Sequence, residues 1–255
     1  MWIIHGYGRM GHEVAEIMRG TYDFCTVDPL AEDAEYAALA EIENFREGEA
    51  CSALEGSVLI DFSCPAGSVE AVEWASKNGV CVLVATTGHT EEQMERIRAA
   101  SRYIPVLCTG NTSAGVLATI EMLHYARLAM PDGVVRIEEE HHLGKADAPS
   151  GTAKMMAKEA AMLWGRQVRY GCTREKDEIG VVAVRLPNVV GRHRITISNG
   201  LERIEIQHVA HDRKLFAEGA IRAVELLRGK KPGLYGQKDL IAWIFGKKLN
   251  DCTEN

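Results

Sequence analysis

Short apolar runs alternate with longer stretches of helical spacing in the first half of the chain. The runs are four to six residues long, and several are rich in Val, Ile or Leu; they predict strands at 2–5, 24–28, 58–62, 81–86 and 105–109. The stretches between them predict helices that include 10–19, 66–77 and 90–101. Continuous apolar runs are typical of strands covered on both faces, as in a parallel sheet. The repeated strand–helix units therefore predict an α/β fold with a doubly wound, Rossmann-type domain.

The pattern changes near residue 112. In the strand-like run at 204–210, Ile204, Ile206 and His208 alternate with Glu205 and Gln207, so this sheet is expected to have two unlike faces. The other elements expected after residue 112 are helices at 113–129, 150–164 and 213–228 and strands at 134–142, 181–186 and 193–198. These features predict a second, α+β domain built on a mixed sheet. We place the first domain at 1–112 and the second at 113–220, and we expect 221–255 to pack back onto the first.

Composition narrows the class of protein. Apolar residues make up 46% of the chain and charged residues 25%, which is typical of a globular protein. The net charge of −7 makes nucleic acid an improbable partner. No apolar run is long enough to span a membrane, and the N-terminus lacks the features of a signal peptide. The seven cysteines are odd in number and form no C-x-x-C pair, so we expect reduced thiols and a cytoplasmic location.

A glycine-rich turn follows the first predicted strand. Gly6-Tyr7-Gly8-Arg9-Met10-Gly11 matches G-x-G-x-x-G and opens a predicted helix. Glycines let the backbone approach a pyrophosphate, and the helix N-terminus offers free N–H groups and a positive dipole. Asp28 ends the second predicted strand, where an acidic side chain can accept hydrogen bonds from the adenosine ribose. The turn therefore predicts a dinucleotide site; the simpler alternative is a tight turn without a ligand.

Other strand ends are expected at the same carboxyl edge of the sheet, where α/β folds bind ligands. Thr86-Thr87-Gly88 follows the fourth strand, and Asn111 follows the fifth. Taken alone, Thr-Thr-Gly is more typical of an ordinary turn than of a cofactor contact. After the third strand, Ser63 or Cys64 is expected to begin a helix that has Pro65 in its first turn.

The densest chemistry lies between residues 138 and 153. His141, His142 and Lys145 fall within five positions, and Ser150-Gly151-Thr152 opens a predicted helix. Ser150 can cap this helix, which would direct the N–H groups of Gly151 and Thr152 at an anion such as a substrate carboxylate. Histidine and lysine are residue types that can donate protons in enzymes. The alternative is a charged surface strand followed by a capped helix.

Neighbouring strand residues point to opposite faces, so His141 and His142 can share a site only at a bulge or at the strand end. A zinc site formed by Glu140, His141 and His142 is disfavoured, because three consecutive residues cannot easily present a tetrahedral ligand set. We predict no metal. Farther along, Arg192-His193-Arg194 opens a strand and is interpreted as a solvated edge, with a second anion contact as the alternative.

These residues also carry a resemblance to a known family. The segment from Glu140 to Ala153, which contains His141-His142, Lys145 and Asp147-Ala148-Pro149-Ser150-Gly151-Thr152, resembles the signature of the dihydrodipicolinate reductases. The resemblance covers nearly the whole chain, including Gly8-Arg9-Met10-Gly11, Asp61-Phe62-Ser63, Thr86-Thr87-Gly88 and the run from 205 to 220. Three positions depart from the usual family pattern, which has glycine at His5, often an aromatic residue at Thr112 and often a histidine at Gly144.

The resemblance implies a pyridine-nucleotide reductase that acts on a cyclic dicarboxylate in the diaminopimelate route to lysine. It implies that His141 is a proton donor or acceptor and Lys145 a proton donor. The substrate-binding residues would be His142, Ser150, Gly151 and Thr152. The cofactor-binding residues would be Gly6, Gly8, Arg9, Met10, Gly11, Asp28, Thr86, Thr87, Gly88 and Asn111. Members of the family are commonly homotetramers joined through the sheet of the second domain.

The cofactor is expected to be NADH in preference to NADPH. A 2′-phosphate beside Asp28 would face a like charge, and no Lys or Arg lies between Asp28 and Arg46. Arg9 is the nearby cation through which NADPH could bind instead.

Two other functions remain open from the sequence. The first is a reductase or dehydrogenase of an amino-acid semialdehyde or of a dicarboxylic amino acid, which would use the same cofactor domain. The second is a non-catalytic nucleotide-sensing protein, which would keep the glycine turn without needing His141 or Lys145.

Overall fold

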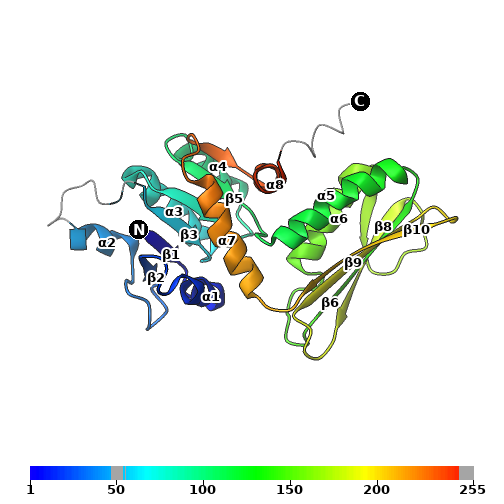
Figure 1. Cartoon of the computed structure of the whole chain (residues 1–255), viewed down its shortest axis with the longest axis horizontal. Helices are drawn as coiled ribbons and strands as arrows, with labels where there is room; N and C mark the ends of the chain where they lie inside the picture. Colours follow the sequence, from blue (N-terminus) through cyan, green and yellow to red (C-terminus); the bar gives the residue numbers. More distant parts are fainter. Residues whose placement is uncertain (47–53, 55, 247–255) are drawn as a thin grey trace. The chain divides into compact units, whose positions relative to one another are not determined.

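The computed structural model describes residues 1–46, 54 and 56–246. The chain divides into two compact units, of which the first combines residues 1–113 with 214–255 and the second comprises 114–213. Each unit is built on one sheet (Figure 1).

The first unit contains a six-stranded sheet in the order β11-β5-β4-β3-β1-β2, in which every neighbouring pair is parallel. The order reverses at β1, because β2 lies on one side of it and β3 on the other. Ligands bind at such a switch point in open α/β sheets, beyond the carboxyl ends of the strands. The strands are β1 (Trp2–His5), β2 (Phe24–Val27), β3 (Val58–Asp61), β4 (Cys81–Val84), β5 (Pro105–Cys108) and β11 (Gly233–Tyr235).

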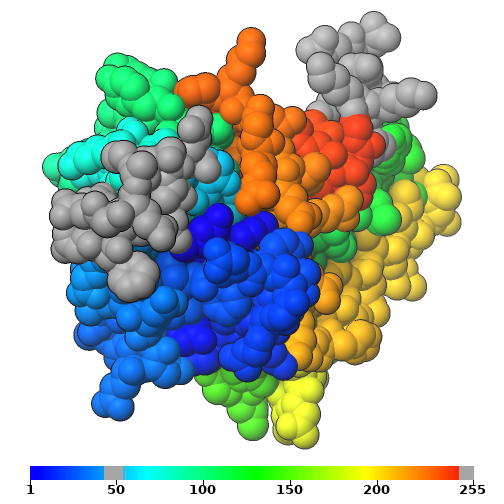
Figure 2. Space-filling model, turned by 60° about the vertical axis from the view of Figure 1, so that its left-hand side comes forward, coloured from blue at the N-terminus to red at the C-terminus, as the bar shows by residue number. Residues whose placement is uncertain are grey.

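Helices pack on this sheet in pairs. α1 (Arg9–Met18) packs against α7 (Lys214–Leu227), and α3 (Pro65–Asn78) packs against α4 (Glu91–Ala100). Figure 2 shows α1, in blue, and α7, in orange, side by side on one face although they are far apart in the sequence. The remaining helices of the unit are α2 (Leu39–Arg46) and α8 (Gln237–Phe245).

The second unit contains a mixed five-stranded sheet in the order β10-β9-β6-β8-β7. β9 is antiparallel to both β10 and β6, whereas β8 is parallel to both β6 and β7. Helices α5 and α6 lie on one face of this sheet (Figure 1). The elements are α5 (Ala114–Ala129), β6 (Val134–His141), α6 (Gly151–Trp164), β7 (Gln167–Tyr170), β8 (Glu178–Arg185), β9 (Gly191–Ser198) and β10 (Arg203–Ala210).

Buried and half-buried side chains alternate along the strands of the second sheet, because helices cover only one of its faces. Along β6, the side chains of Val135, Ile137, Glu139 and His141 are buried, and those between them are only half-buried. β9 shows the same alternation. A strand that is packed on one face alone requires this period of two.

The fold class expected from the sequence is confirmed: a parallel Rossmann-type sheet and a second unit on a mixed sheet. The helix after β3 begins as expected, with Cys64 as N-cap and Pro65 in the first turn. Four elements were not predicted, namely α2, β7, β11 and α8. β7 and β11 are four and three residues long and carry little buried apolar surface, so they leave a weak periodic signal.

Two sequence-based expectations differ from the structure. The contacts of α7 with α1 place residues 214–220 in the first unit, whereas we had assigned them to the second domain. The interpretation of Arg192-His193-Arg194 as a solvated edge is wrong. β9 lies between β10 and β6, and His193 is only 4% exposed.

Candidate active site

The glycine-rich turn connects β1 to α1 at the switch point of the first sheet. Gly6 has a φ of +87°, and a Cβ there would lie 2.6 Å from backbone atoms of Phe62 and Ser63. Gly11 is equally constrained, since its Cβ would overlap the carbonyl of Gly6. Gly8 has open space in front of its Cα and is exposed. The first and third glycines are thus required for packing, and Gly8 leaves the backbone accessible to a ligand.

Asp28 follows β2 and connects to this turn. Its Oδ2 accepts a hydrogen bond from the Tyr7 N–H at 2.8 Å, and its Oδ1 accepts one from the Leu30 N–H at 2.8 Å. The carboxylate is half-buried, and Arg9 beyond the turn is exposed. An acidic group is therefore fixed beside the glycine turn, at the place expected for the adenosine ribose.

A buried carboxylate network lies next to the turn. Asp61 ends β3 and is fully buried; its Oδ1 contacts His5 Nδ1 at 2.8 Å and accepts from Ser63 Oγ. Its Oδ2 accepts from Ser68 Oγ and from Thr86 Oγ1, the latter at 2.7 Å. Burial opposes the charge, but the bonds from His5 and the hydroxyls hold the pKa of Asp61 below its ordinary value. His5, a departure from the family pattern, is therefore part of this network.

The other cofactor candidates lie at the ends of β4 and β5. Thr87 and Gly88 are exposed, and Thr86 is held by Asp61. Asn111 is only 5% exposed, and its Oδ1 accepts a hydrogen bond from the Ser113 N–H at 2.9 Å. The side-chain oxygen of Asn111 thus stabilises the turn that follows β5.

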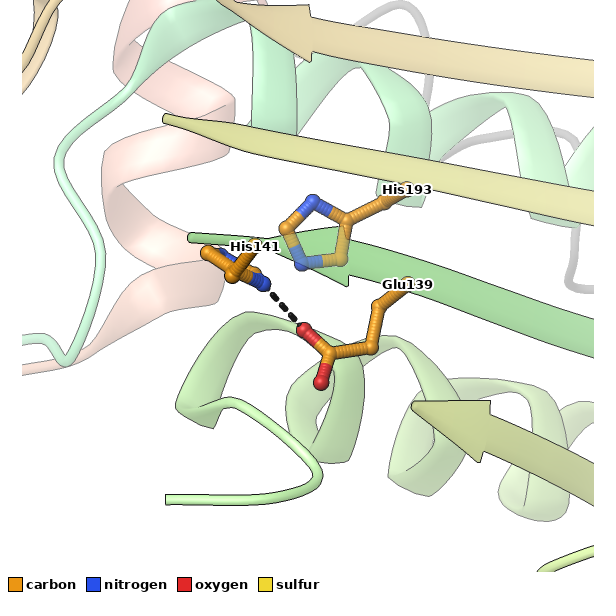
Figure 3. Close-up of side chains that lie close together, drawn as sticks. All are labelled: Glu139, His141 and His193. Atoms are coloured by element: carbon orange, nitrogen blue, oxygen red, sulfur yellow. Dashed lines mark ion pairs between the residues drawn. The ribbon is translucent and has the colours of Figure 1, made fainter. Parts of the chain in front are cut away.

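The acid–base candidates lie in the second unit. His141 is the last residue of β6, where its side chain is 10% exposed on the buried face of the sheet. Figure 3 shows His141, Glu139 on the same strand and His193 on the adjacent strand pointing toward one another. The rings of His141 and His193 meet edge to face, with centroids 5.2 Å apart. Burial, followed by the charge of His141, lowers the pKa of His193 to about 3, so this imidazole is neutral at pH 7.

Glu139 is the central anion of this group and is fully buried. Its Oε2 forms an ion pair with His141 Nδ1, drawn in Figure 3. Its Oε1 accepts from Arg185 Nη1 at 2.9 Å and from the Ser150 N–H at 3.2 Å. Burial by itself would raise the pKa of Glu139, but these donors lower it to about 2. Glu139 is therefore ionised across the physiological range.

Lys145 lies on the loop between β6 and α6. Its Nζ forms an ion pair with Asp147 Oδ1 at 2.7 Å, and its side chain is 24% exposed. Burial opposes ionisation of Asp147, but the bond and charge of Lys145 keep the pKa of that carboxyl below its ordinary value. His142 follows the last residue of β6, and its Nε2 lies 3.2 Å from Arg213 Nη2.

Ser150 begins α6 as its N-cap, as the sequence predicted. Its hydroxyl accepts from the Ala153 N–H at 3.1 Å and lies 3.1 Å from His193 Nε2. The residue is buried, so its side chain serves the helix and His193 instead of pointing outward. Gly151 is exposed and Thr152 half-buried, which leaves the first turn of the helix accessible at these two positions.

Glu139, His141 and His193 each offer one atom that a metal ion could bind, and these atoms lie within 4.8 Å of one another. Two observations speak against a metal at this position. Nδ1 of His141 and Oε2 of Glu139 already contact each other, and Arg185 adds a cation to the same carboxylate. That the protein needs no metal stays a prediction.

Sequence reasoning missed Glu139, Arg185 and Asp61 as parts of the site. Glu139 could have been found, because it is two residues before His141 and therefore on the same face of the strand. Arg185 carries no local signal. It meets Glu139 only because β8 pairs with β6.

Comparison with known proteins places these residues in context. Two family models match the chain: one described as "Dihydrodipicolinate reductase, N-terminus" over residues 2–112, and one described as "Dihydrodipicolinate reductase, C-terminus" over residues 115–241. Among the residues that the structure describes, no helix has the length and apolar character that crossing a membrane requires.

Two relatives named 4-hydroxy-tetrahydrodipicolinate reductase are similar over most of their length. The one from Methanoregula boonei is 36% identical over 92% of this chain and 94% of its own. The one from Caldanaerobacter subterraneus subsp. tengcongensis is 33% identical over 94% of this chain and 97% of its own. In fold, the chain is similar to the dipicolinate-bound dihydrodipicolinate reductase from Paenisporosarcina sp. TG-14. The TM-score is 0.74 at 21% identity, over 94% of this chain and 98% of that one.

Proposed function

Since this chain belongs to the dihydrodipicolinate reductase family, we propose that it uses His141 and Lys145 to reduce a dihydrodipicolinate-type cyclic dicarboxylate to tetrahydrodipicolinate. The family consists of NAD(P)H-dependent oxidoreductases of diaminopimelate and lysine biosynthesis. One observation carries the assignment of residues. The Glu139 carboxylate forms an ion pair with His141 and accepts hydrogen bonds from Arg185 and from the Ser150 N–H at the start of α6.

Each group has a definite task in this reaction. The nicotinamide cofactor supplies a hydride when it is bound. His141 and Lys145 hold the proton that balances the hydride, and the substrate leaves with one hydride and one proton added. The N–H groups of Gly151 and Thr152, together with His142, bind the carboxylates, because a helix N-terminus favours anions. Ser150 supports this binding by capping the helix.

The residues proposed to hold the cofactor belong to the first unit. The glycine turn at Gly6, Gly8 and Gly11, with Arg9 and Met10, would accept the pyrophosphate at the start of α1. Asp28 would accept the ribose hydroxyls. Thr86, Thr87, Gly88 and Asn111 complete the set at the ends of β4 and β5.

NADH is proposed as the preferred cofactor, because hydrogen bonds hold the carboxylate of Asp28 beside the glycine turn, and a 2′-phosphate bound there would face a like charge. At about 4 Å, like charges repel by roughly 1 kcal/mol in water and about 4 kcal/mol at an effective dielectric constant near 20. These energies correspond to about five-fold to several hundred-fold discrimination. The test is kcat/KM for both cofactors at one ionic strength. A ratio of NADH to NADPH at or below one would show that Arg9 or another base outweighs Asp28.

The activity is tested by a coupled assay. The cyclised aldol product of pyruvate and aspartate semialdehyde, which gives the dihydrodipicolinate-type substrate on loss of water, is supplied, and nicotinamide absorbance is followed. We expect NADH oxidation that depends on this product, no NADH oxidation with aspartate semialdehyde alone, and no reduction of NAD⁺ with diaminopimelate. Turnover of either of those instead would favour the semialdehyde or amino-acid dehydrogenase, and cofactor binding without turnover would favour a nucleotide sensor.

A homotetramer and a cytoplasmic location complete the proposal. The face of the second sheet opposite α5 and α6 carries half-buried Val182 and Val184 on β8, beside two charge pairs that join β6 to β9, Glu138–Arg194 and Glu140–Arg192. A second copy of this chain could cover the two valines. Reduced thiols fit a cytoplasmic enzyme: among the described residues, Cys64, Cys81, Cys108 and Cys172 are free cysteines.

A further inference from the structure

The carboxylate of Glu139 stands out as a fully buried anion that the proposed reaction does not use directly. A buried charge is retained at low cost only where donors surround it. Here Oε1 accepts hydrogen bonds from Arg185 and from the Ser150 N–H, and Oε2 forms an ion pair with His141. Neither Oε2 nor His141 Nδ1 has another hydrogen-bonding partner among the described residues. The charge on Glu139 Oε2 therefore decides whether His141 Nδ1 carries a proton.

We propose that Glu139 and Arg185 are positioning residues for proton transfer. Glu139 holds the proton of His141 on Nδ1 and so leaves Nε2 to exchange protons; Arg185 fixes Glu139 and, with it, the loop of Lys145. This inference rests on the proposed role of His141 in the reductase. It adds two residues that do not touch the substrate and that act through His141 and Lys145.

The tautomer of His141 follows from donor and acceptor chemistry. An ionised carboxylate can only accept hydrogen bonds, so the ring nitrogen that faces it must carry hydrogen. The pKa of Glu139, about 2, keeps it ionised at neutral pH. Nε2 then points to the neighbouring strand at Gly191, where an added Cβ would lie 3.0 Å from it. The absence of a side chain at Gly191 leaves Nε2 the space that a proton-exchanging atom needs.

Arg185 connects the two proton-transfer residues. On adjacent strands it is the register partner of His141. Besides Glu139, its guanidinium donates to the backbone carbonyl of Lys145 at 3.3 Å and to that of Asp147. One rigid, planar group thus ties the anion behind His141 to the loop that carries Lys145.

The first test replaces Glu139 by Gln. The guanidinium of Arg185 can only donate, so the Gln oxygen faces Arg185 and its NH2 faces His141 Nδ1. The ring proton must then move to Nε2. We expect kcat to fall roughly 10²–10⁴-fold, the range for misdirecting a general acid–base group, while the Kd of NADH stays at the wild-type value.

The tautomer is read directly from ¹⁵N chemical shifts of histidine-labelled protein, with His141→Asn to assign the signal. Wild type should show the proton on Nδ1, and Glu139→Gln should show it on Nε2. Glu138→Gln is the matched control, because Glu138 precedes Glu139 on the same strand and pairs with Arg194 on the opposite face. That variant should keep both the rate and the tautomer of wild type.

A second variant separates positioning from folding. Glu139→Gln leaves Arg185 without its anion, so Glu139→Gln with Arg185→Met removes both charges. We expect this double variant to regain the Tm lost by the single one and to remain slow. Recovery of kcat together with Tm, a wild-type kcat in Glu139→Gln, or an Nδ1 proton on His141 in that variant would overturn the proposal. The two proposals fail in different experiments. Lack of reductase activity in the wild-type protein would refute the proposed function. The NMR measurement needs no substrate, so it tests the role of Glu139 in either case.

Discussion

At the residue scale, the structure shows the surroundings of Lys145, the proposed proton donor. Its ammonium group is partly exposed and paired with Asp147, within a loop that Arg185 holds. We expect Lys145→Ala to lower kcat roughly 10²–10⁴-fold, as the loss of a general acid does. The Kd of NADH should barely change, because the proposed cofactor residues belong to the other unit. Lys158→Ala, at an exposed position of α6, is the control. A normal kcat in Lys145→Ala would remove Lys145 from the mechanism.

Gly191 is a second residue whose substitution should affect catalysis, because a Cβ at this position would press against the ring of His141. A methyl group there would lie 3.0 Å from Nε2 and 3.4 Å from Cδ2 of His141, so the ring must move. A displaced catalytic group slows chemistry, and we expect Gly191→Ala to lower kcat about 10- to 100-fold. Gly236→Ala is the control, since an added Cβ there meets nothing within 4 Å. Equal steady-state kinetics for Gly191→Ala and Gly236→Ala would show that the His141 ring can shift without loss of activity.

At the scale of elements, the interior strand β9 buries a histidine whose titration should affect the stability of the fold. The pKa of His193 falls from 6.5 to about 3 on folding, mainly through burial. Between these values the unfolded chain binds a proton that the folded chain does not. The free energy of unfolding therefore falls as the pH drops below 6.5, by about 1.4 kcal/mol per pH unit for one proton.

Urea unfolding at pH 7, 6 and 5, at one protein concentration, measures this dependence. Wild type should lose stability over this range more steeply than His193→Gln, which keeps a polar group near Ser150 but does not titrate. Glu139 does not contribute to the difference, because its pKa is displaced downward to about 2 and its transition lies at lower pH. Parallel pH dependences for the two proteins would contradict a neutral, buried His193.

At the scale of the whole molecule, the open face of the second sheet bears on assembly. We expect light scattering to give about four times the 28.1 kDa chain mass. Val182→Glu, which places a charge among the half-buried residues of that face, should dissociate the assembly, whereas Leu201→Glu at a 96% exposed position should not. A tetramer that tolerates Val182→Glu would place the interface elsewhere.

Local sequence determined most of the elements, with α2, β7, β11 and α8 as the exceptions, and the chemistry that depends on them. The apolar periods of the strands, the glycine turn before α1 and the caps at Cys64 and Ser150 are properties of neighbouring residues, and the structure contains each of them. The cluster of His141, Lys145 and the start of α6 was visible for the same reason, because its members are close in the sequence.

Tertiary structure decided which residues surround that cluster. Arg185 lies 46 positions from Glu139, and only the pairing of β8 with β6 brings them together. His193 lies 43 positions from Ser150, which contacts it from the N-cap of α6. Strand pairing also made β9 an interior strand and buried His193, which its flanking arginines did not suggest. The physical reason is that backbone hydrogen bonds between strands depend on partners far along the chain. A buried charged side chain is costly unless an opposite charge pairs with it, and here that partner lies on the adjacent strand.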